Sequence, residues 1–197
     1  MAGFYRTRAA WLIFFTAGFI PLVYILVVAF QGGLGAEPAK ALVEYLGEVA
    51  ILLLLLVLSL TPLRRISVLS GLNRSRRMLG LFVFFYALLH LSAYALLLVD
   101  LQNFVVDLYG RLYVTAGFVA FVILLLLALT SPRVMVRRLG RRWKPLHRMV
   151  YLAVCVALIH VFWQVRSDYT EVAFYALIAL VLLSFRLSYF TKRVFGV

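Results

Sequence analysis

Six long stretches of apolar residues limit what this chain can fold into more than any other feature of its sequence. A helix that crosses a bilayer needs roughly 20 mostly apolar residues, and each stretch is close to that length. The composition agrees, because 65% hydrophobic residues and a mean hydropathy of +1.05 lie far above the values of soluble domains. We therefore predict a single all-α transmembrane domain over residues 1–197, with helices at 11–30, 46–63, 78–99, 112–130, 146–165 and 172–190.

The charged residues predict the orientation of these helices. Lys and Arg in short loops stay on the cytoplasmic side of a membrane. The loops that hold only Lys40, Arg111 and Arg166 also have every acidic residue in or beside them. The basic and the acidic residues therefore both predict six crossings with an N-in, C-in topology, in which both termini lie in the cytoplasm. The basic residues of the other loops and ends are Arg6, Arg8, Arg64, Arg65, Arg74, Arg76, Arg77, Arg133, Arg137, Arg138, Arg141, Arg142, Lys144, Lys192 and Arg193.

Several other classes of protein are excluded by composition and motif. The net charge of +13 suits a nucleic-acid-binding protein, but basic residues in alternate loops are explained by membrane insertion, so we expect no nucleic-acid partner. Cys155 is the only cysteine, which excludes an internal disulfide, an iron–sulfur cluster and a covalently attached haem. The glycines at 32–35 follow a membrane helix and predict a turn rather than a phosphate-binding loop. No internal repeat or soluble linker is evident.

Two of the three histidines are expected at the same depth in the membrane. His90 lies about 13 residues, or roughly 20 Å, beyond Arg77 on the third helix, and His160 lies about 16 residues beyond Lys144 on the fifth. Both helices run outward, so both imidazoles reach the outer half of the bilayer. A six-coordinate b-type haem needs one imidazole on each face of its iron, which this pair offers. The alternative is that each histidine simply hydrogen-bonds to a neighbouring helix.

His147 lies at the inner end of the fifth helix and fits this scheme less well. On an ideal helix it lies roughly 140° around from His160, so one straight helix cannot direct both side chains into the same space between helices. Basic side chains surround it in the sequence. They form either a girdle that contacts lipid phosphates or a pocket for an anionic cofactor such as a flavin phosphate. The candidate pocket residues are Arg74, Arg76, Arg77, Arg141, Arg142 and Arg148.

Several spaced motifs resemble one known family. They are RRMLGL at 76–81, LHL at 89–91, WKPLHR at 143–148 with Tyr151, and His160 with Trp163, together with GLGAEP at 33–38 and LTPL at 60–63. The chain resembles the MsrQ (YedZ) family of bacterial haem-binding membrane subunits, within the ferric-reductase-like transmembrane superfamily. The resemblance implies haem b and FMN as cofactors, and His90, His147 and His160 as haem-site histidines.

The resemblance also implies a function in the bacterial inner membrane. Members of this family pass electrons, from the quinone pool or a cytosolic flavin reductase, to the periplasmic molybdenum-containing subunit MsrP, which reduces methionine sulfoxide in oxidised periplasmic proteins. We accordingly expect an electron-transfer subunit rather than a catalytic one. Few residues follow the last helix, so we expect the electron donor to be a separate molecule. Two alternatives remain: a stand-alone quinol or ferric reductase, and a small-solute transporter, although the membrane midplane is almost purely apolar apart from the histidines.

Overall fold

The computed structural model describes the backbone of residues 8–63 and 75–195 and the side chains of residues 12–60 and 75–185. Every element within those ranges is a helix. In chain order the elements are α1 (Arg8–Ala17), α2 (Ile20–Phe30), α3 (Pro38–Leu63), α4 (Arg76–Ala93), η3 (Tyr94–Leu98), α5 (Leu101–Gly110), α6 (Leu112–Leu129), α7 (Arg133–Leu139), η4 (Gly140–Arg142), α8 (Trp143–His147), α9 (Met149–Gln164) and α10 (Thr170–Phe195).

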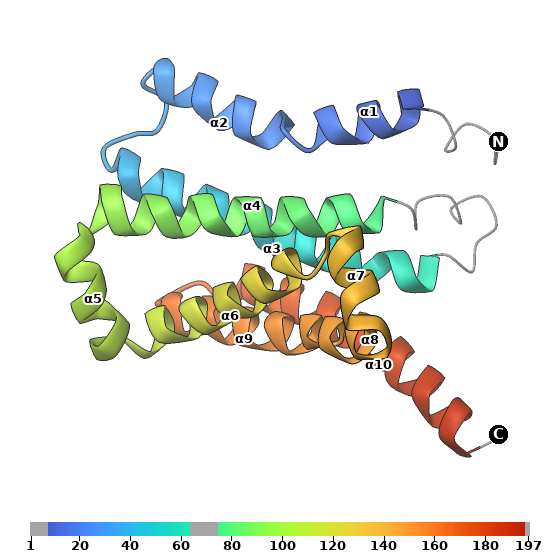
Figure 1. Cartoon of the computed structure of the whole chain (residues 1–197). Coiled ribbons are helices and arrows are strands. Elements are labelled where there is room, and N and C mark those ends of the chain that lie inside the picture. Colours follow the sequence, from blue (N-terminus) through green and yellow to red (C-terminus); the bar gives the residue numbers. More distant parts are fainter. Residues whose placement is uncertain (1–7, 64–74, 196–197) are drawn as a thin grey trace.

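The long helices form a bundle of antiparallel pairs. α3 packs along α4 and α6 packs along α9, and these are the two most extensive helix pairings of the described chain. The short helix α5 lies across one end of the bundle, between the end of α4 and the start of α6 (Figure 1). α1 begins and α10 ends at the opposite end (Figure 1). An even number of membrane crossings places the beginning of the first helix and the end of the last helix at the same end of a bundle, as seen here.

The membrane class predicted from the sequence is confirmed, and four of the six predicted crossings have a counterpart, or five if a bent pair of helices is counted as one span. Four candidate spans cover Leu12–Phe30, Pro38–Leu60, Arg76–Leu98 and Leu112–Leu129. A fifth consists of two parts, Arg133–His147 and Met149–Gln164, that meet at 42°. The described apolar part of α10, Thr170–Phe185, is shorter than a full span. A crossing by α10 therefore remains a prediction, and residues 64–74, with their arginines, lie outside the described ranges.

Two of the predicted helix limits are wrong for physical reasons. α3 begins at Pro38 rather than at residue 46, because proline suits the first position of a helix, where its missing N–H costs nothing. The charges of Lys40 and Glu44 interrupt the apolar pattern there without interrupting the helix. The predicted helix 146–165 is broken at Arg148, between α8 and α9.

A tyrosine side chain holds the break in the first span. The backbone N–H of Leu22 would bond to the carbonyl of Gly18 in a continuous helix. The Tyr86 hydroxyl lies between them instead: it accepts from Leu22 N at 3.2 Å and donates to Gly18 O at 2.7 Å. The neighbouring Pro21 lacks an N–H, which weakens the same turn. The first span is thus broken next to Pro21, and a group inserted from α4 stabilises the break.

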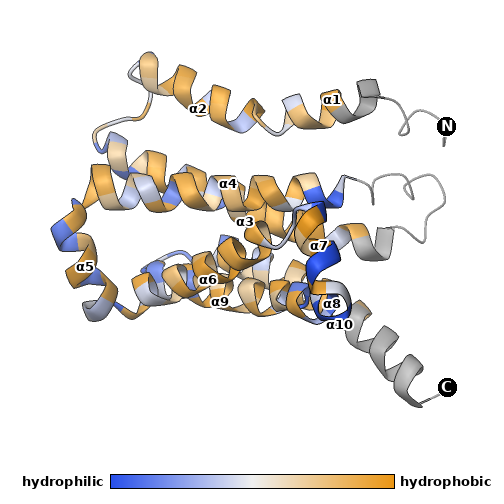
Figure 2. Cartoon of the chain, viewed as in Figure 1, coloured by the Kyte–Doolittle hydropathy of each residue, from blue (hydrophilic) through white to orange (hydrophobic). Residues whose placement is uncertain are grey.

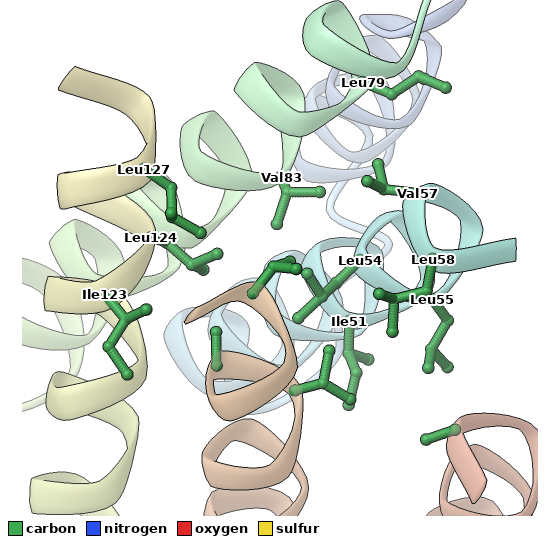
Figure 3. Close-up of a cluster of buried hydrophobic side chains, with 14 of the residues drawn as sticks. Ile51, Leu54, Leu55, Val57, Leu58, Leu79, Val83, Ile123, Leu124 and Leu127 are labelled. Atoms are coloured by element: carbon green, nitrogen blue, oxygen red, sulfur yellow. The ribbon is translucent and has the colours of Figure 1, made fainter. Parts of the chain in front are cut away.

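Apolar side chains from four helices meet in the middle of the bundle (Figure 3). Leu54 of α3, Val83 of α4 and Leu124 and Leu127 of α6 belong to one buried cluster, together with Val154 of α9. Hydrophobic residues also cover most of the outer surface of the long helices, whereas hydrophilic residues gather at the two ends of the bundle (Figure 2). A surface of this kind is stable in lipid, where apolar side chains cost nothing to expose.

The hydroxyl of Tyr86 provides the first testable prediction. The Tyr86 side chain is fully buried, so Tyr86→Phe leaves the Leu22 N–H and the Gly18 carbonyl without their partner. We expect the free energy of unfolding to fall by about 1–3 kcal/mol, the usual cost of unsatisfied buried polar groups. Thermal unfolding of the purified protein in detergent measures this. Tyr109→Phe is the matched control, because Tyr109 is 86% exposed; equal losses for both variants would contradict the prediction.

Candidate functional site

His90 lies in the last turn of α4, and its ring contacts α3. Its ring nitrogen Nδ1 lies 2.8 Å from the backbone carbonyl of Val43. A carbonyl can only accept, so Nδ1 carries the proton and donates. The other nitrogen, Nε2, then has a free lone pair, and no other described residue hydrogen-bonds to it. A metal-binding histidine typically has this arrangement, in which one nitrogen is held by a carbonyl and the other is presented to the metal.

His160 has the same arrangement on α9. Its Nδ1 donates to the backbone carbonyl of Tyr113, on α6, over 2.7 Å. The Tyr113 ring also stacks on the imidazole, with centroids 6.3 Å apart and planes 30° apart. Within the described chain, Nε2 of His160 is likewise without a hydrogen-bond partner. Both histidines are therefore held in the tautomer that a metal ligand requires.

The two imidazoles lie next to each other, as the depth argument predicted. Their centroids are 6.1 Å apart and their planes cross at 79°. An imidazole nitrogen binds a first-row metal ion at about 2 Å, so two rings that bind one ion from opposite sides have centres about 6 Å apart. The observed separation agrees with that value. His90 and His160 thus have the spacing and the tautomers of a pair of axial haem ligands.

Both rings line a large cavity between the two helix pairs. Its volume is about 1270 Å³, above the range of about 300–1,000 Å³ that is usual for small-molecule sites. Apolar side chains form the wall beyond the histidines: Leu54, Val83, Ala87, Leu124, Ala157 and Val161. Polar residues from the first turns of α3 and α10 and from the segments beside them form the rim: Glu37, Lys40, Glu44, Glu48, Arg166 and Glu171. The cavity therefore extends from the histidine pair toward the end of the bundle at which α3 begins and α9 ends.

His147 lies elsewhere and is held differently. Its Nε2 lies 3.1 Å from the hydroxyl of Thr130, and that hydroxyl already donates to the Leu126 carbonyl at 2.7 Å. His147 therefore donates from Nε2. Its ring also stacks on Trp143, with centroids 4.1 Å apart. The residue does not line the cavity of His90 and His160, so the structure brings together two of the three predicted histidines and leaves the third apart.

The candidate flavin-binding arginines that the structure describes lie at the end of the bundle where α4 begins. Arg76 and Arg77 begin α4, Arg141 and Arg142 form η4, and Arg148 separates α8 from α9. Figure 2 shows hydrophilic residues at the start of α4 and along α7 and α8, at the same end of the bundle. Arg76 is near enough to act electrostatically on His147. None of these arginines lines the cavity of the histidine pair, and Arg74 lies outside the described residues.

Comparison with known proteins places the chain in one family. The model of the family "Ferric reductase like transmembrane component" matches residues 46–158, more than half of the chain. This chain belongs to that family. The matched range begins in α3, ends in α9, and includes His90 and His147.

Curated relatives show which subunits of the ferric reductase-like family this chain is similar to along most of its length. The chain is 43% identical over 179 residues to the protein-methionine-sulfoxide reductase heme-binding subunit MsrQ of Pectobacterium carotovorum, covering 89% of this chain and 90% of that protein. The MsrQ subunit of Klebsiella pneumoniae is 42% identical over 190 residues, covering 94% and 96%. That of Cronobacter sakazakii is 44% identical over 173 residues, covering 86% of each chain. The resemblance seen in the sequence is thereby confirmed.

A polar network beside α5, at one end of this ferric reductase-like bundle, was not predicted from the sequence. Asp107 of α5 is the one buried charged residue of the described chain. It accepts from the Tyr94 hydroxyl at 2.7 Å and pairs with Arg111 Nε at 2.8 Å. Arg111 also donates to the Tyr113 hydroxyl over 3.1 Å. That hydrogen bond and the Asp107 carboxylate raise the pKa of Arg111, so the guanidinium stays charged and ties α5 to the residue that holds His160.

Replacement of Asp107 tests how much this network contributes. Asp107→Asn removes the ion pair with Arg111 and keeps an acceptor for Tyr94. Because Arg111 is half-exposed, we expect a loss of only about 1 kcal/mol in the free energy of unfolding. Asp100→Asn is the control, since asparagine caps a helix as well as aspartate and tolerates the φ of 68° at that position. The thermal midpoint should fall for the first variant alone; equal midpoints would show that the ion pair is unimportant.

Proposed function

We propose that this chain is the haem-binding, electron-transferring membrane subunit of a periplasmic methionine sulfoxide reductase system. The observation that carries the proposal is the pair His90 and His160, whose rings lie 6.1 Å apart with both Nε2 atoms available. The similarity to MsrQ subunits along about nine tenths of the chain supports it. The partner would be the molybdenum-containing reductase MsrP, and this subunit would relay electrons rather than bind the oxidised substrate.

In this proposal the residues around the pair prepare it for haem b. The iron supplies one-electron chemistry between its ferric and ferrous states. The carbonyls of Val43 and Tyr113 fix the orientation of the imidazoles and raise their basicity, which favours the ferric state. The apolar wall that includes Leu54 and Leu124 keeps water away from the ligands. The chain's own contribution is therefore a dry, oriented pair of strong ligands.

The topology proposed with this function is six crossings with both termini in the cytoplasm. α10 is the sixth crossing in this scheme, since its 26 residues are long enough for a tilted span. The outer ends of α3 and α9 then face the periplasm, and the basic helix α7 faces the cytoplasm. Electrons would enter at the inner side, from the quinone pool or a cytosolic flavin reductase, and leave through the rim of the cavity.

Histidine variants test the haem site. Replacing His90 or His160 by alanine removes one axial ligand, so we expect the low-spin haem spectrum of the purified protein to be lost. His147→Ala is the matched control, because His147 lies outside the cavity and donates to Thr130. It should keep the low-spin haem of the His90–His160 pair. A full low-spin spectrum in His90→Ala would overturn the assignment.

The crossing angle of the rings supplies an independent readout. Ferric low-spin haem with perpendicular imidazole planes gives a strongly anisotropic electron paramagnetic resonance spectrum, whereas parallel planes give a rhombic one. The planes of His90 and His160 cross at 79°, so we expect the anisotropic form.

Electron transfer to free ferric chelates, without transfer to a periplasmic reductase, would instead favour a stand-alone reductase that uses the same haem.

We also propose that FMN binds at the basic inner end, through Arg76, Arg77, Arg141, Arg142 and Arg148 and with Arg74 nearby in the sequence. Planar guanidinium groups suit the two-point recognition of a phosphate. The exposed side chains of Arg77, Arg141 and Arg142 are free to meet such a ligand.

Cofactor analysis of an arginine variant tests this second site. In Arg77→Gln/Arg141→Gln we expect the FMN content to fall and the haem content to stay unchanged, because the arginines do not line the haem cavity. Arg133→Gln/Arg137→Gln, on the neighbouring helix α7, is the matched control for the loss of two positive charges. Unchanged FMN in the first variant would exclude the inner pocket.

A further inference from the structure

The two histidines belong to two half-sites of the same construction. In each, the ring donates to a backbone carbonyl 47 residues earlier in the chain, on the helix that packs against its own. The carbonyl residue is Val43 for His90 and Tyr113 for His160. Each member of the second half-site lies 70 residues after its counterpart in the first. The two half-sites come from the α3–α4 pair and the α6–α9 pair.

A glycine completes each half-site. Gly47 and Gly117 follow the carbonyl residue by one helical turn and are also 70 residues apart. A Cβ at Gly47 would lie 2.9 Å from both Cε1 and Nδ1 of His90. A Cβ at Gly117 would lie 2.8 Å from Nδ1 and 2.9 Å from Cε1 of His160. Each imidazole thus lies directly against the backbone of the neighbouring helix, where no other residue leaves room for it.

Helix geometry explains why the glycine lies four residues after the carbonyl. The carbonyl of residue i points along the helix toward residue i+4. The Cβ of residue i+4 tilts back toward the N-terminus, and so toward that carbonyl. A ring that reaches the carbonyl from a neighbouring helix therefore covers residue i+4. Only glycine permits this contact, so the carbonyl and the glycine are both needed to hold the ring in this position.

The spacing of 70 residues also relates buried residues outside the two half-sites. Leu54 and Leu124, again 70 residues apart, are both buried and both line the cavity. Val83 on α4 and Ala153 on α9 share the same spacing and are both fully buried. No repeat is evident in the sequence as a whole, but the residues that hold the two rings and several that pack around the cavity share this spacing of 70 residues.

We propose that Gly47 and Gly117 are positioning residues for the haem ligands, each holding one imidazole flat against the carbonyl of the neighbouring helix. The inference rests on the proposed haem site and adds to it the residues that set the ring orientations. In each helix pair the glycine lets the ring approach and the carbonyl fixes its rotation. Two such units facing each other then present two Nε2 atoms to one iron at a defined crossing angle.

Alanine at either glycine forces the imidazole to move. A side chain that moves away by a few tenths of an ångström lengthens its bond to the carbonyl and changes the crossing angle. Partners of metal-binding histidines typically contribute roughly 10-fold to 100-fold in metal affinity, and we expect a loss of haem affinity in that range for each variant. The effect should be larger for Gly117→Ala, because the stacked Tyr113 ring limits where His160 can move.

The first experiment measures haem retention and the electron paramagnetic resonance spectrum of Gly47→Ala and Gly117→Ala. We expect weaker retention and a change in the anisotropic signal of the remaining haem. Gly80→Ala is the matched control: Gly80 also lies in a membrane helix, but a Cβ there meets nothing within 4 Å. It should keep the parent's haem and spectrum. Parent-like retention and spectra in both Gly47→Ala and Gly117→Ala would overturn the proposal.

A double-mutant cycle covers the case in which an alanine variant folds poorly. The stability of the haem-free chain is measured for Gly47→Ala, His90→Ala and the two together. If the alanine acts through the ring, its cost disappears once His90 is replaced. A cost that persists means that Gly47 serves helix packing alone, and the proposal fails. Absence of haem from the parent would instead overturn the proposed function and leave the coupling between glycine and ring intact.

Discussion

Every polar group inside a bilayer must find its partner within the protein, and the central features of this bundle follow from that constraint. The two imidazoles satisfy it with backbone carbonyls, which have a spare lone pair even inside a helix. The broken turn between α1 and α2 satisfies it with the hydroxyl of Tyr86. In each case a side chain from one helix bonds to the backbone of another. Such bonds fix how the helices are placed, because lipid removes the hydrophobic drive that would otherwise hold them together.

The same constraint selects the chemistry of the site. An imidazole that donates from Nδ1 has only its Nε2 lone pair left, and no described residue of the cavity donates to that lone pair. Two such nitrogens face the cavity between the helix pairs. A metal centre that takes one nitrogen on each side satisfies both at once. The two helix pairs are thus suited to a ligand with two equivalent faces.

The sequence predicted the parts of this structure that depend on counting residues. The apolar stretches located the helices, and the distance of His90 and His160 from the basic loops placed the two rings at one level. The partners of the rings could not be predicted from the sequence, because the atoms that hold the rings are backbone carbonyls, and these occur at every position. Gly47 and Gly117 were the available signal: two glycines with the same spacing as the two histidines. The break at Arg148 leaves no mark in the apolar pattern, which predicted one helix over 146–165.

At the inner end the correspondence between the helix pairs stops, and the reason is physical. The residue 70 positions before His147 is Arg77, which is exposed at the start of α4, whereas His147 donates to Thr130 and stacks on Trp143. α9 is also preceded by the bend of 42°, for which the described start of α4 has no equivalent. In the proposed site, two helices must stay alike only where both would hold the same flat group from opposite sides. At the other end of the bundle that requirement is gone, and in the proposed topology the basic charge that retains a loop in the cytoplasm becomes the dominant constraint.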